Sequence, residues 1–184
     1  MPFVYESSYS IDLMELKRLT EALSLYAFDC GDEDLNGFLL EDALPSAQKH
    51  IANTFVLCDE DRIVAYFCLL TDKITKLETT NADWRRFRKQ FPHGKQFSSY
   101  PSVKIGRFAV SQDYRKGGVG TNLMNWIKLQ LLQTITLPAY RFLTVDAYLS
   151  AIPFYEKNGF RQLQPLDDNK DTRLMFFDML TVTE

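Results

Sequence analysis

A glycine-rich turn carries the residue types in this sequence that are best suited to binding an anion. The six residues RKGGVG, Arg115–Gly120, place two cations before three glycines. The preceding segment, Val103–Val110, has the pattern of a strand, and an apolar-patterned helix follows the turn. Because the first N–H groups of a helix have no partner within it and lie at the positive end of its dipole, such a turn can bind a pyrophosphate through its amides.

Glycine would serve this purpose in two ways. Without a side chain the backbone can approach a ligand closely, and it can adopt positive φ angles. Gly118 and Gly120 are spaced so that successive amides can line one concavity, with Arg115 and Lys116 adding positive charge. Two better-known phosphate loops, GxxxxGK followed by Ser or Thr and GxGxxG, do not occur, which argues against a nucleotide-binding switch. On its own, the turn is equally compatible with a tight structural connection.

The elements that must position this turn follow from the spacing of apolar residues. Before it we expect a helix from Ser10 to Leu23, a helix entered from the acidic segment after Cys30, and a hairpin of strands Thr54–Cys58 and Arg62–Leu70. After it we expect a helix to about Leu132, a strand Arg141–Ala147, a short helix closed by Asn158-Gly159, and strands near Phe160–Gln164 and Arg173–Leu180. Mixed helices and strands without a repeat or linker predict one α/β (α+β) domain over residues 1–184.

Composition narrows the class of protein. The chain has 184 residues, 46% hydrophobic and 24% charged, with a net charge of −3, so it shows no overall bias toward nucleic acid or anionic membranes. Its three cysteines form no CxxC pair, which predicts buried thiols in a reducing cytoplasm and no metal site. We expect neither a signal peptide nor a membrane span, since no apolar stretch approaches the ~20 residues that a spanning helix needs.

A basic stretch stands out against this acidic background. Between Arg85 and Lys95 the chain carries five Lys and Arg residues and no acid. Aromatic residues recur there at helical spacing, at Trp84, Phe87 and Phe91. The pattern predicts an amphipathic helix with a solvated basic face, and the alternative is a surface that binds phosphates.

Two blocks of the sequence carry a family resemblance. RKGGVG matches the pattern of Arg or Gln, two residues, Gly, one residue, and Gly or Ala. AIPFYEKNGF, Ala151–Phe160, matches AxxFYEKxGF, and a helix and a strand separate the two blocks. Together they resemble the GNAT N-acetyltransferase superfamily over about the last half of the chain. The resemblance implies a mixed, mostly antiparallel central sheet with two splayed parallel strands, flanked by helices. It also implies direct transfer of an acetyl group from acetyl-CoA to a primary amine in a ternary complex, without a metal.

The resemblance also implies where acetyl-CoA binds. The cofactor would lie between two splayed strands, Arg107–Val110 and Arg141–Ala147. Backbone groups of Phe108 and Val110 would bind the pantetheine arm, an N–H near Val110 would stabilise the oxyanion, and the turn would bind the pyrophosphate. The implied cofactor contacts are Phe108, Ala109, Val110, Arg115, Lys116, Gly117, Gly118, Val119, Gly120 and Thr121.

Tyr155 is the residue to which the resemblance assigns catalysis. Its hydroxyl would protonate or hydrogen-bond the departing thiolate, whereas the alternative is a core aromatic on a short helix. The chain departs from many relatives at Tyr148, where they have an Asn that contacts the cofactor arm. No general base is evident. Asp146 lies on the second splayed strand, where the alternative to a base is a local hydrogen bond, and the two histidines are expected at the surface.

A narrower resemblance concerns the acceptor. FDCGDEDLNGFL, Phe28–Leu39, and IGRFAVSQDYRKGGVG are similar to the branch that contains GNAT toxins, whose members acetylate the α-amino group of aminoacyl-tRNA. The wider GNAT resemblance leads us to expect a small-molecule or peptide amine as acceptor, and this narrower resemblance gives charged tRNA as the alternative. A homodimer is compatible with the resemblance. A non-catalytic module that binds CoA as a sensor or scaffold is a further alternative, although the intact turn and Tyr155 argue against it.

Overall fold

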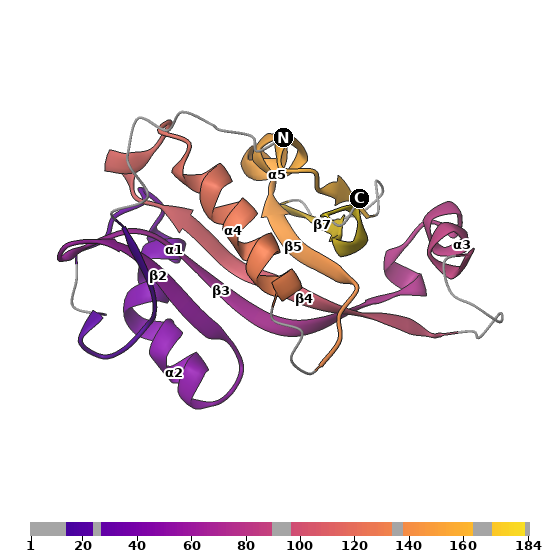
Figure 1. The fold of residues 1–184 in the computed structure, drawn as a ribbon, viewed down its shortest axis with the longest axis horizontal. Coiled ribbons are helices and arrows are strands. Elements are labelled where there is room, and N and C mark those ends of the chain that lie inside the picture. Colours follow the sequence, from indigo (N-terminus) through magenta and orange to yellow (C-terminus); the bar gives the residue numbers. More distant parts are fainter. Residues whose placement is uncertain (1–13, 24–26, 90–96, 134–137, 164–170, 183–184) are drawn as a thin grey trace. The chain divides into compact units, whose positions relative to one another are not determined.

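The computed structural model describes residues 14–23, 27–89, 97–133, 138–163 and 171–182 (Figure 1). Its strands are β1 (Glu15–Arg18), β2 (Asn53–Asp59), β3 (Arg62–Thr75), β4 (Ser99–Val110), β5 (Phe142–Tyr148), β6 (Arg161–Gln162) and β7 (Thr172–Asp178). Its helices are α1 (Glu33–Gly37), a π-helical segment (Phe38–Asp42), α2 (Ala43–Gln48), α3 (Asn81–Lys89), α4 (Val119–Gln133) and α5 (Ile152–Lys157). Short 3-10 turns lie at Lys76–Glu78, Gln112–Tyr114, Leu149–Ala151 and Met179–Val182.

In the described part of the chain, seven strands form one sheet in the order β1-β2-β3-β4-β5-β7-β6. The pairs β1-β2, β2-β3, β5-β7 and β6-β7 are antiparallel, whereas β4 and β5 are parallel. The parallel ladder runs from Ser102 opposite Phe142 to Ile105 opposite Val145. Both strands continue beyond it, β4 to Val110 and β5 to Tyr148. The predicted mixed, mostly antiparallel sheet flanked by helices is confirmed.

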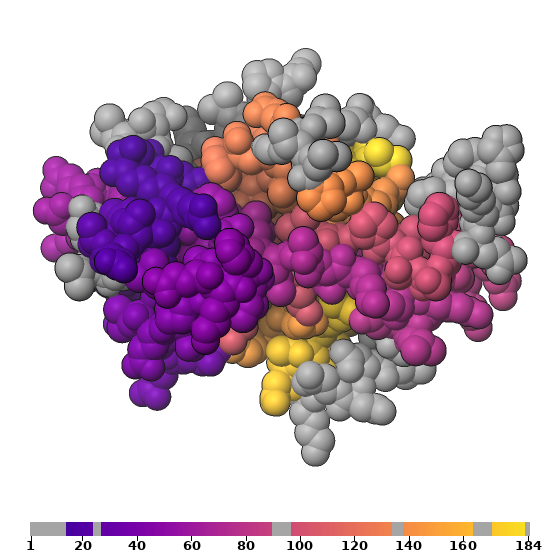
Figure 2. Space-filling view, turned by 90° about the horizontal axis from the view of Figure 1, so that it is seen from below, coloured from indigo at the N-terminus to yellow at the C-terminus, as the bar shows by residue number. Residues whose placement is uncertain are grey.

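The chain divides into two compact units that share β3, β4 and α4. The first comprises residues 1–70 and 106–127, and the second comprises residues 71–105 and 128–184. In Figure 2 the described residues of the first unit up to Leu70 are coloured from indigo to purple. The glycine-rich turn belongs to the first unit and Tyr155 to the second.

Tyr66 on β3 lies at the centre of the first unit's core. Its side chain is fully buried, and its hydroxyl donates to the Leu35 carbonyl at 2.7 Å. The ring contacts Phe28 edge-on at 5.3 Å and stacks with Phe38 at 6.2 Å between centroids. These contacts attach α1 and the loop before it to the sheet, on the side where Figure 1 shows α1 and α2 beside β2.

The helical segment after α1 changes its hydrogen-bond register ahead of a proline. Pro45 lies in the first turn of α2 and has no amide to donate to the Glu41 carbonyl. In the π-helical segment before it, the Ala43 N–H donates to the Phe38 carbonyl, five residues back. The sequence predicted helical spacing here but not this change of register.

Aromatic side chains form the core of the second unit and bury one face of α3. Phe87 lies 4.6 Å from Phe142 and 5.4 Å from Phe176, ring centroid to centroid. Trp84 lies 4.9 Å from Tyr100. The predicted amphipathic helix is therefore confirmed over α3, while Phe91 and Lys95 lie outside the described residues.

The helix predicted over residues 10–23 is wrong in its described part. Glu15–Arg18 forms the edge strand β1, which pairs antiparallel with β2. Leu19 and Leu23, which follow the strand, belong to the core of the first unit, so the chain buries leucines at a helical spacing without forming a helix there. Apolar spacing alone did not distinguish the two structures, and backbone pairing with β2 decides between them.

The other predicted elements are confirmed with shifted ends. The hairpin of β2 and β3 forms, but β3 continues past Leu70 to Thr75, and β4 begins at Ser99. The three cysteines are buried free thiols, as expected. Within the described residues, none of the helices combines the length and the apolar character needed to cross a bilayer.

Candidate functional site

The glycine-rich turn connects β4 to α4 through left-handed backbone. After β4 the Ser111 N–H donates to the Val64 carbonyl at 2.8 Å, and a 3-10 turn follows. Lys116 then has a φ of 67° and Gly118 a φ of 81°. The first bond of α4 runs from the Asn122 N–H to the Gly118 carbonyl at 3.0 Å. The amides just before Asn122 therefore precede the helical bonding pattern, as those of an anion-binding helix start do.

Gly118 also leaves room for a ligand. A Cβ built on Gly118 would meet only the Asn122 side-chain nitrogen, 3.9 Å away. The position thus needs glycine for its positive φ rather than for lack of space. A lysine in the left-handed region, as at Lys116, is uncommon and costs of order 1 kcal/mol or more, which is typical of functional turns. The geometry fits the binding of a pyrophosphate by the turn.

Asp29 holds the loop before α1 against the approach to this turn. One carboxylate oxygen accepts from the Gly31 N–H at 2.7 Å and from the Asn36 side chain at 2.8 Å. The other accepts from the Gln112 side-chain amide at 2.9 Å, and the Gln112 N–H donates to the Asp29 carbonyl. The hydrogen bonds from Gly31 and Asn36 lower the pKa of Asp29 below its usual value. We call this set of contacts the Asp29 clamp.

Arg115 extends the Asp29 clamp to the glycine-rich turn itself. Its guanidinium donates to the carbonyl of Cys30, the residue after Asp29. The Cys30 N–H in turn donates to the Asn36 side-chain oxygen at 2.9 Å. Arg115 therefore contributes to holding the turn, a role that the sequence did not predict, in addition to its positive charge beside it.

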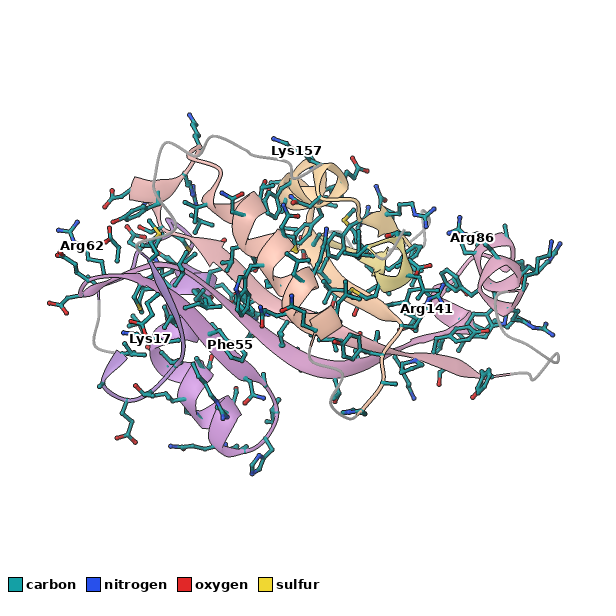
Figure 3. All side chains as sticks on the ribbon, viewed as in Figure 1. Lys17, Phe55, Arg62, Arg86, Arg141 and Lys157 are labelled. Atoms are coloured by element: carbon teal, nitrogen blue, oxygen red, sulfur yellow. The ribbon has the colours of Figure 1, made fainter. Side chains whose placement is uncertain are left out.

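A cavity of about 510 Å³ adjoins the Asp29 clamp. Its lining includes Phe28, Asp29, Arg62, Gln112 and Tyr114, and Figure 3 shows Arg62 at the end of the β2–β3 hairpin. The lining contains none of the predicted cofactor contacts. The lining ends at Tyr114, the residue before Arg115.

Tyr155 lies on α5, within the second unit. It is 6% exposed, and its ring makes edge-to-face contacts with Phe154 at 5.3 Å and Phe160 at 5.4 Å. Burial raises the pKa of the Tyr155 phenol well above its usual range. The phenol is therefore neutral near pH 7 and can donate a proton but not accept one as phenolate.

The remaining candidates are Asp146, Tyr148 and the two histidines. Asp146 forms an ion pair with Lys104, which joins β5 to β4. Tyr148 ends β5 and is exposed, as is His50, while His93 lies outside the described residues. None of these observations identifies a general base.

The sequence missed two groups of residues. Asp29 and Gln112 are 83 positions apart, so their contact leaves no local signal. Lys128 on α4 is buried, with its ammonium donating to the Asn158 carbonyl. It did leave a signal, because it falls four residues after the buried Met124 and therefore on the apolar face of the helix.

A protein-family model matches the part of the chain that carries these residues. A model of the acetyltransferase (GNAT) domain matches residues 50–162, more than half of the chain, and includes both the turn and Tyr155. The chain belongs to the GNAT acetyltransferase family. The family resemblance found in the sequence is thereby confirmed.

Two curated GNAT relatives match parts of the chain. S-(2-succino)cysteine N-acetyltransferase of Bacillus subtilis is 35% identical over 72 residues, which cover 39% of this chain and 44% of the relative. A tRNA-acetylating toxin of Mycobacterium tuberculosis is 22% identical over 108 residues, covering 59% of this chain and 60% of the toxin. The matched part therefore spans about half of each relative's length.

Solved structures share the fold over nearly the whole chain. AtaT complexed with acetyl-methionyl-tRNAfMet has a TM-score of 0.71 and 24% identity, over 92% of this chain and 97% of that one. AtaTR bound with AcCoA has a TM-score of 0.70 and 23% identity, over 94% and 97% of the two chains. At these identities the likeness shows a shared fold and nothing more.

The Asp29 clamp should make stability depend on pH. Because the pKa of Asp29 in the folded state lies below its unperturbed value of 3.8, the carboxylate stabilises the fold above that pH and loses this effect on further acidification. Asp29→Ala should lower the urea midpoint at pH 7, and the difference from the parent should shrink at pH 3. Asp61→Ala, in the exposed hairpin turn, is the matched control and should match the parent at both values. An equal deficit at both pH values would refute the clamp.

Proposed function

We propose that this protein is an acetyl-CoA-dependent N-acetyltransferase that acetylates the α-amino group of an amino acid derivative. The observation that supports this most directly is the left-handed turn at Lys116 and Gly118, which begins α4 within a GNAT domain. The two curated relatives act on an S-substituted cysteine and on tRNA, by their names. An α-amine suits an enzyme without an evident base, because its pKa near 8 leaves a fraction neutral at pH 7.

The residues available for acetyl-CoA follow the chain from β4 into α4. Phe108, Ala109 and Val110 lie on the part of β4 beyond the parallel ladder, where backbone can bind an extended arm as an added strand does. The amides from Lys116 to Thr121 would bind the pyrophosphate at the helix start, with the Lys116 side chain adding positive charge. The thioester, when bound, supplies the activated acetyl group.

Transfer needs no covalent enzyme intermediate. The neutral amine forms a bond to the thioester carbonyl carbon, and the carbon–sulfur bond then breaks. The attacking nitrogen loses one proton to water, and the departing thiolate takes one from the Tyr155 hydroxyl, which is a proton donor because burial keeps it neutral. Proton return from solvent restores the phenol. Positioning of the two substrates supplies much of the rate gain.

A second, narrower candidate acceptor is aminoacyl-tRNA, and α3 favours it. Arg85, Arg86, Arg88 and Lys89 are all exposed on α3, whereas Trp84 and Phe87 anchor the opposite face in the core. Figure 3 shows Arg86 on this helix, where it pairs with Asp83 at 3.1 Å. A rigidly anchored helix with a basic outer face suits phosphate contacts along an RNA backbone.

The proposed cofactor site is tested by Gly118→Glu. Glutamate would strain a position with a φ of 81° and would place a negative charge where the pyrophosphate is expected. We expect calorimetric titration of acetyl-CoA to show at least ~100-fold weaker binding, with acetyl transfer lost in parallel. Gly37→Glu is the control, because an added Cβ there meets nothing within 4 Å. A folded Gly118→Glu variant with the parental affinity would exclude the turn as the site.

The tRNA alternative is tested by reversing charge on α3. The variant carries Arg85→Glu, Arg88→Glu and Lys89→Glu, which leaves the Arg86–Asp83 pair intact. For aminoacyl-tRNA we expect KM to rise at least ~10-fold and the log–log salt dependence to flatten by roughly one unit for each lost phosphate contact. A small α-amine acceptor serves as the control substrate and should be unaffected. Acetylation of tRNA that is insensitive to the reversal would exclude α3 as its binding surface.

A further inference from the structure

Lys128 is a buried lysine that the proposed chemistry does not use. It lies on α4 in the second unit and is 6% exposed. A buried ammonium loses its hydration, a cost that persists in a native structure only where other groups offset it. Burial accordingly lowers the pKa of Lys128 to about 8. The groups that offset this cost indicate what the ammonium of Lys128 does in the fold.

The groups around the ammonium are dipoles and aromatic faces. Lys128 Nζ donates to the Asn158 backbone carbonyl. It also lies 3.9 Å from the centroid of the Phe177 ring and 5.3 Å from that of Phe160. A carbonyl oxygen and the faces of aromatic rings all present negative partial charge to a cation. Lys128 therefore joins β7, through Phe177, to the turn that follows α5.

That turn also holds the backbone of Tyr155. The Tyr155 carbonyl accepts from the Asn158 N–H and from the Phe160 N–H, each at 3.0 Å. The Asn158 side chain caps the helix by donating to the Phe154 carbonyl at 2.8 Å. Gly159, with a φ of 81°, closes the turn. Asn158 and Phe160 thus contact both Lys128 and Tyr155.

The side chains make a second connection. The Phe160 ring, which faces the Lys128 ammonium, meets the Tyr155 ring edge-on at 5.4 Å between centroids. The turn has little freedom to shift, because a Cβ added at Gly159 would lie 3.0 Å from the Phe177 ring. Two short routes, one through backbone and one through a ring, therefore join Lys128 to Tyr155.

We propose that Lys128 is a positioning residue for Tyr155: it fixes the Asn158 carbonyl and the Phe160 ring, and through them the direction of the Tyr155 hydroxyl. This inference rests on the proposed function, since it requires the hydroxyl to act on the departing thiolate. Catalysis is sensitive to such positioning, because displacement of a reacting group by ~1 Å can cost on the order of 100-fold in rate.

A purely space-filling role for Lys128 makes a different prediction. Methionine has a similar length and volume without a charge, so Lys128→Met removes the cost of burying an ammonium, which offsets the loss of the donor to the Asn158 carbonyl and leaves Tm nearly unchanged. A space-filling role then predicts parental turnover. A positioning role predicts a lower kcat in a protein that is equally stable, because the Asn158 carbonyl has lost its donor.

The test is a double-mutant cycle of Lys128→Met and Tyr155→Phe, read out by kcat, by KM for acetyl-CoA and by Tm. We expect Tyr155→Phe to lower kcat on the order of 10²–10⁴-fold. Lys128→Met should lower kcat ~10–100-fold with KM for acetyl-CoA nearly unchanged. In the Tyr155→Phe background, Lys128→Met should have less than a ~2-fold effect, because the hydroxyl that it positions is gone. Lys157→Met, on the exposed side of α5 in Figure 3, is the matched control and should have parental kcat.

Each result separates the two claims. If Lys128→Met costs the same factor in both backgrounds, or nothing in the parent, the positioning role is overturned while the proposed function stands. If Tyr155→Phe has parental kcat, the proposed role of Tyr155 fails and the positioning role fails with it. Should Lys128→Met not fold, Lys128→Arg, which keeps the charge but enlarges the head group, takes its place in the cycle with the same criterion of non-additivity.

Discussion

The left-handed backbone between β4 and α4 is the constraint on which the candidate site depends. Lys116 and Gly118 both have positive φ, and the helix begins directly after them. A lysine in that conformation needs support from its surroundings. The Asp29 clamp supplies it from a distant part of the sequence, because Gln112, which begins the 3-10 turn, and Arg115, which follows it, both donate hydrogen bonds to the loop before α1. For the proposed pyrophosphate site, this support would orient the amides of the turn before the ligand binds.

In the second unit, burial and a buried ammonium hold Tyr155 in place. The role proposed for Tyr155 requires a neutral and correctly directed hydroxyl, and burial beside Phe154 and Phe160 keeps the phenol neutral. Direction has to come from the short helix α5, whose six residues have little stability of their own. The Asn158-Gly159 end of that helix is held by its own hydrogen bonds and by the ammonium of Lys128. Burying an ammonium costs free energy of desolvation, and the contact of Lys128 with the turn that holds Tyr155 is the reason for proposing that it positions this residue.

Sequence patterns predicted those features that depend on neighbouring residues. Gly118 and Asn158-Gly159 mark turns because of their own backbone preferences, and α3 shows its apolar face in the spacing of Trp84 and Phe87. Features that depend on contacts between residues far apart in the sequence could not be predicted from local patterns. The segment predicted as a helix over residues 10–23 has helical apolar spacing, but Glu15–Arg18 within it forms the strand β1, because it pairs with β2. Asp29 and Gln112 meet only once the fold has formed, whereas Lys128 could have been noticed as a charge on the apolar face of α4.

The central claim is that the chain couples cleavage of acetyl-CoA to acetylation of an α-amine. The most direct measurement follows free CoA thiol and acetylated amine together, with isotopically labelled acetyl-CoA and a panel of S-substituted cysteines, free amino acids and aminoacyl-tRNAs. The account predicts one thiol released for each α-acetylated product, with at least one member of the panel consumed. Thiol release without acetylated amine, or acetyl-CoA that stays intact with every acceptor, would contradict it.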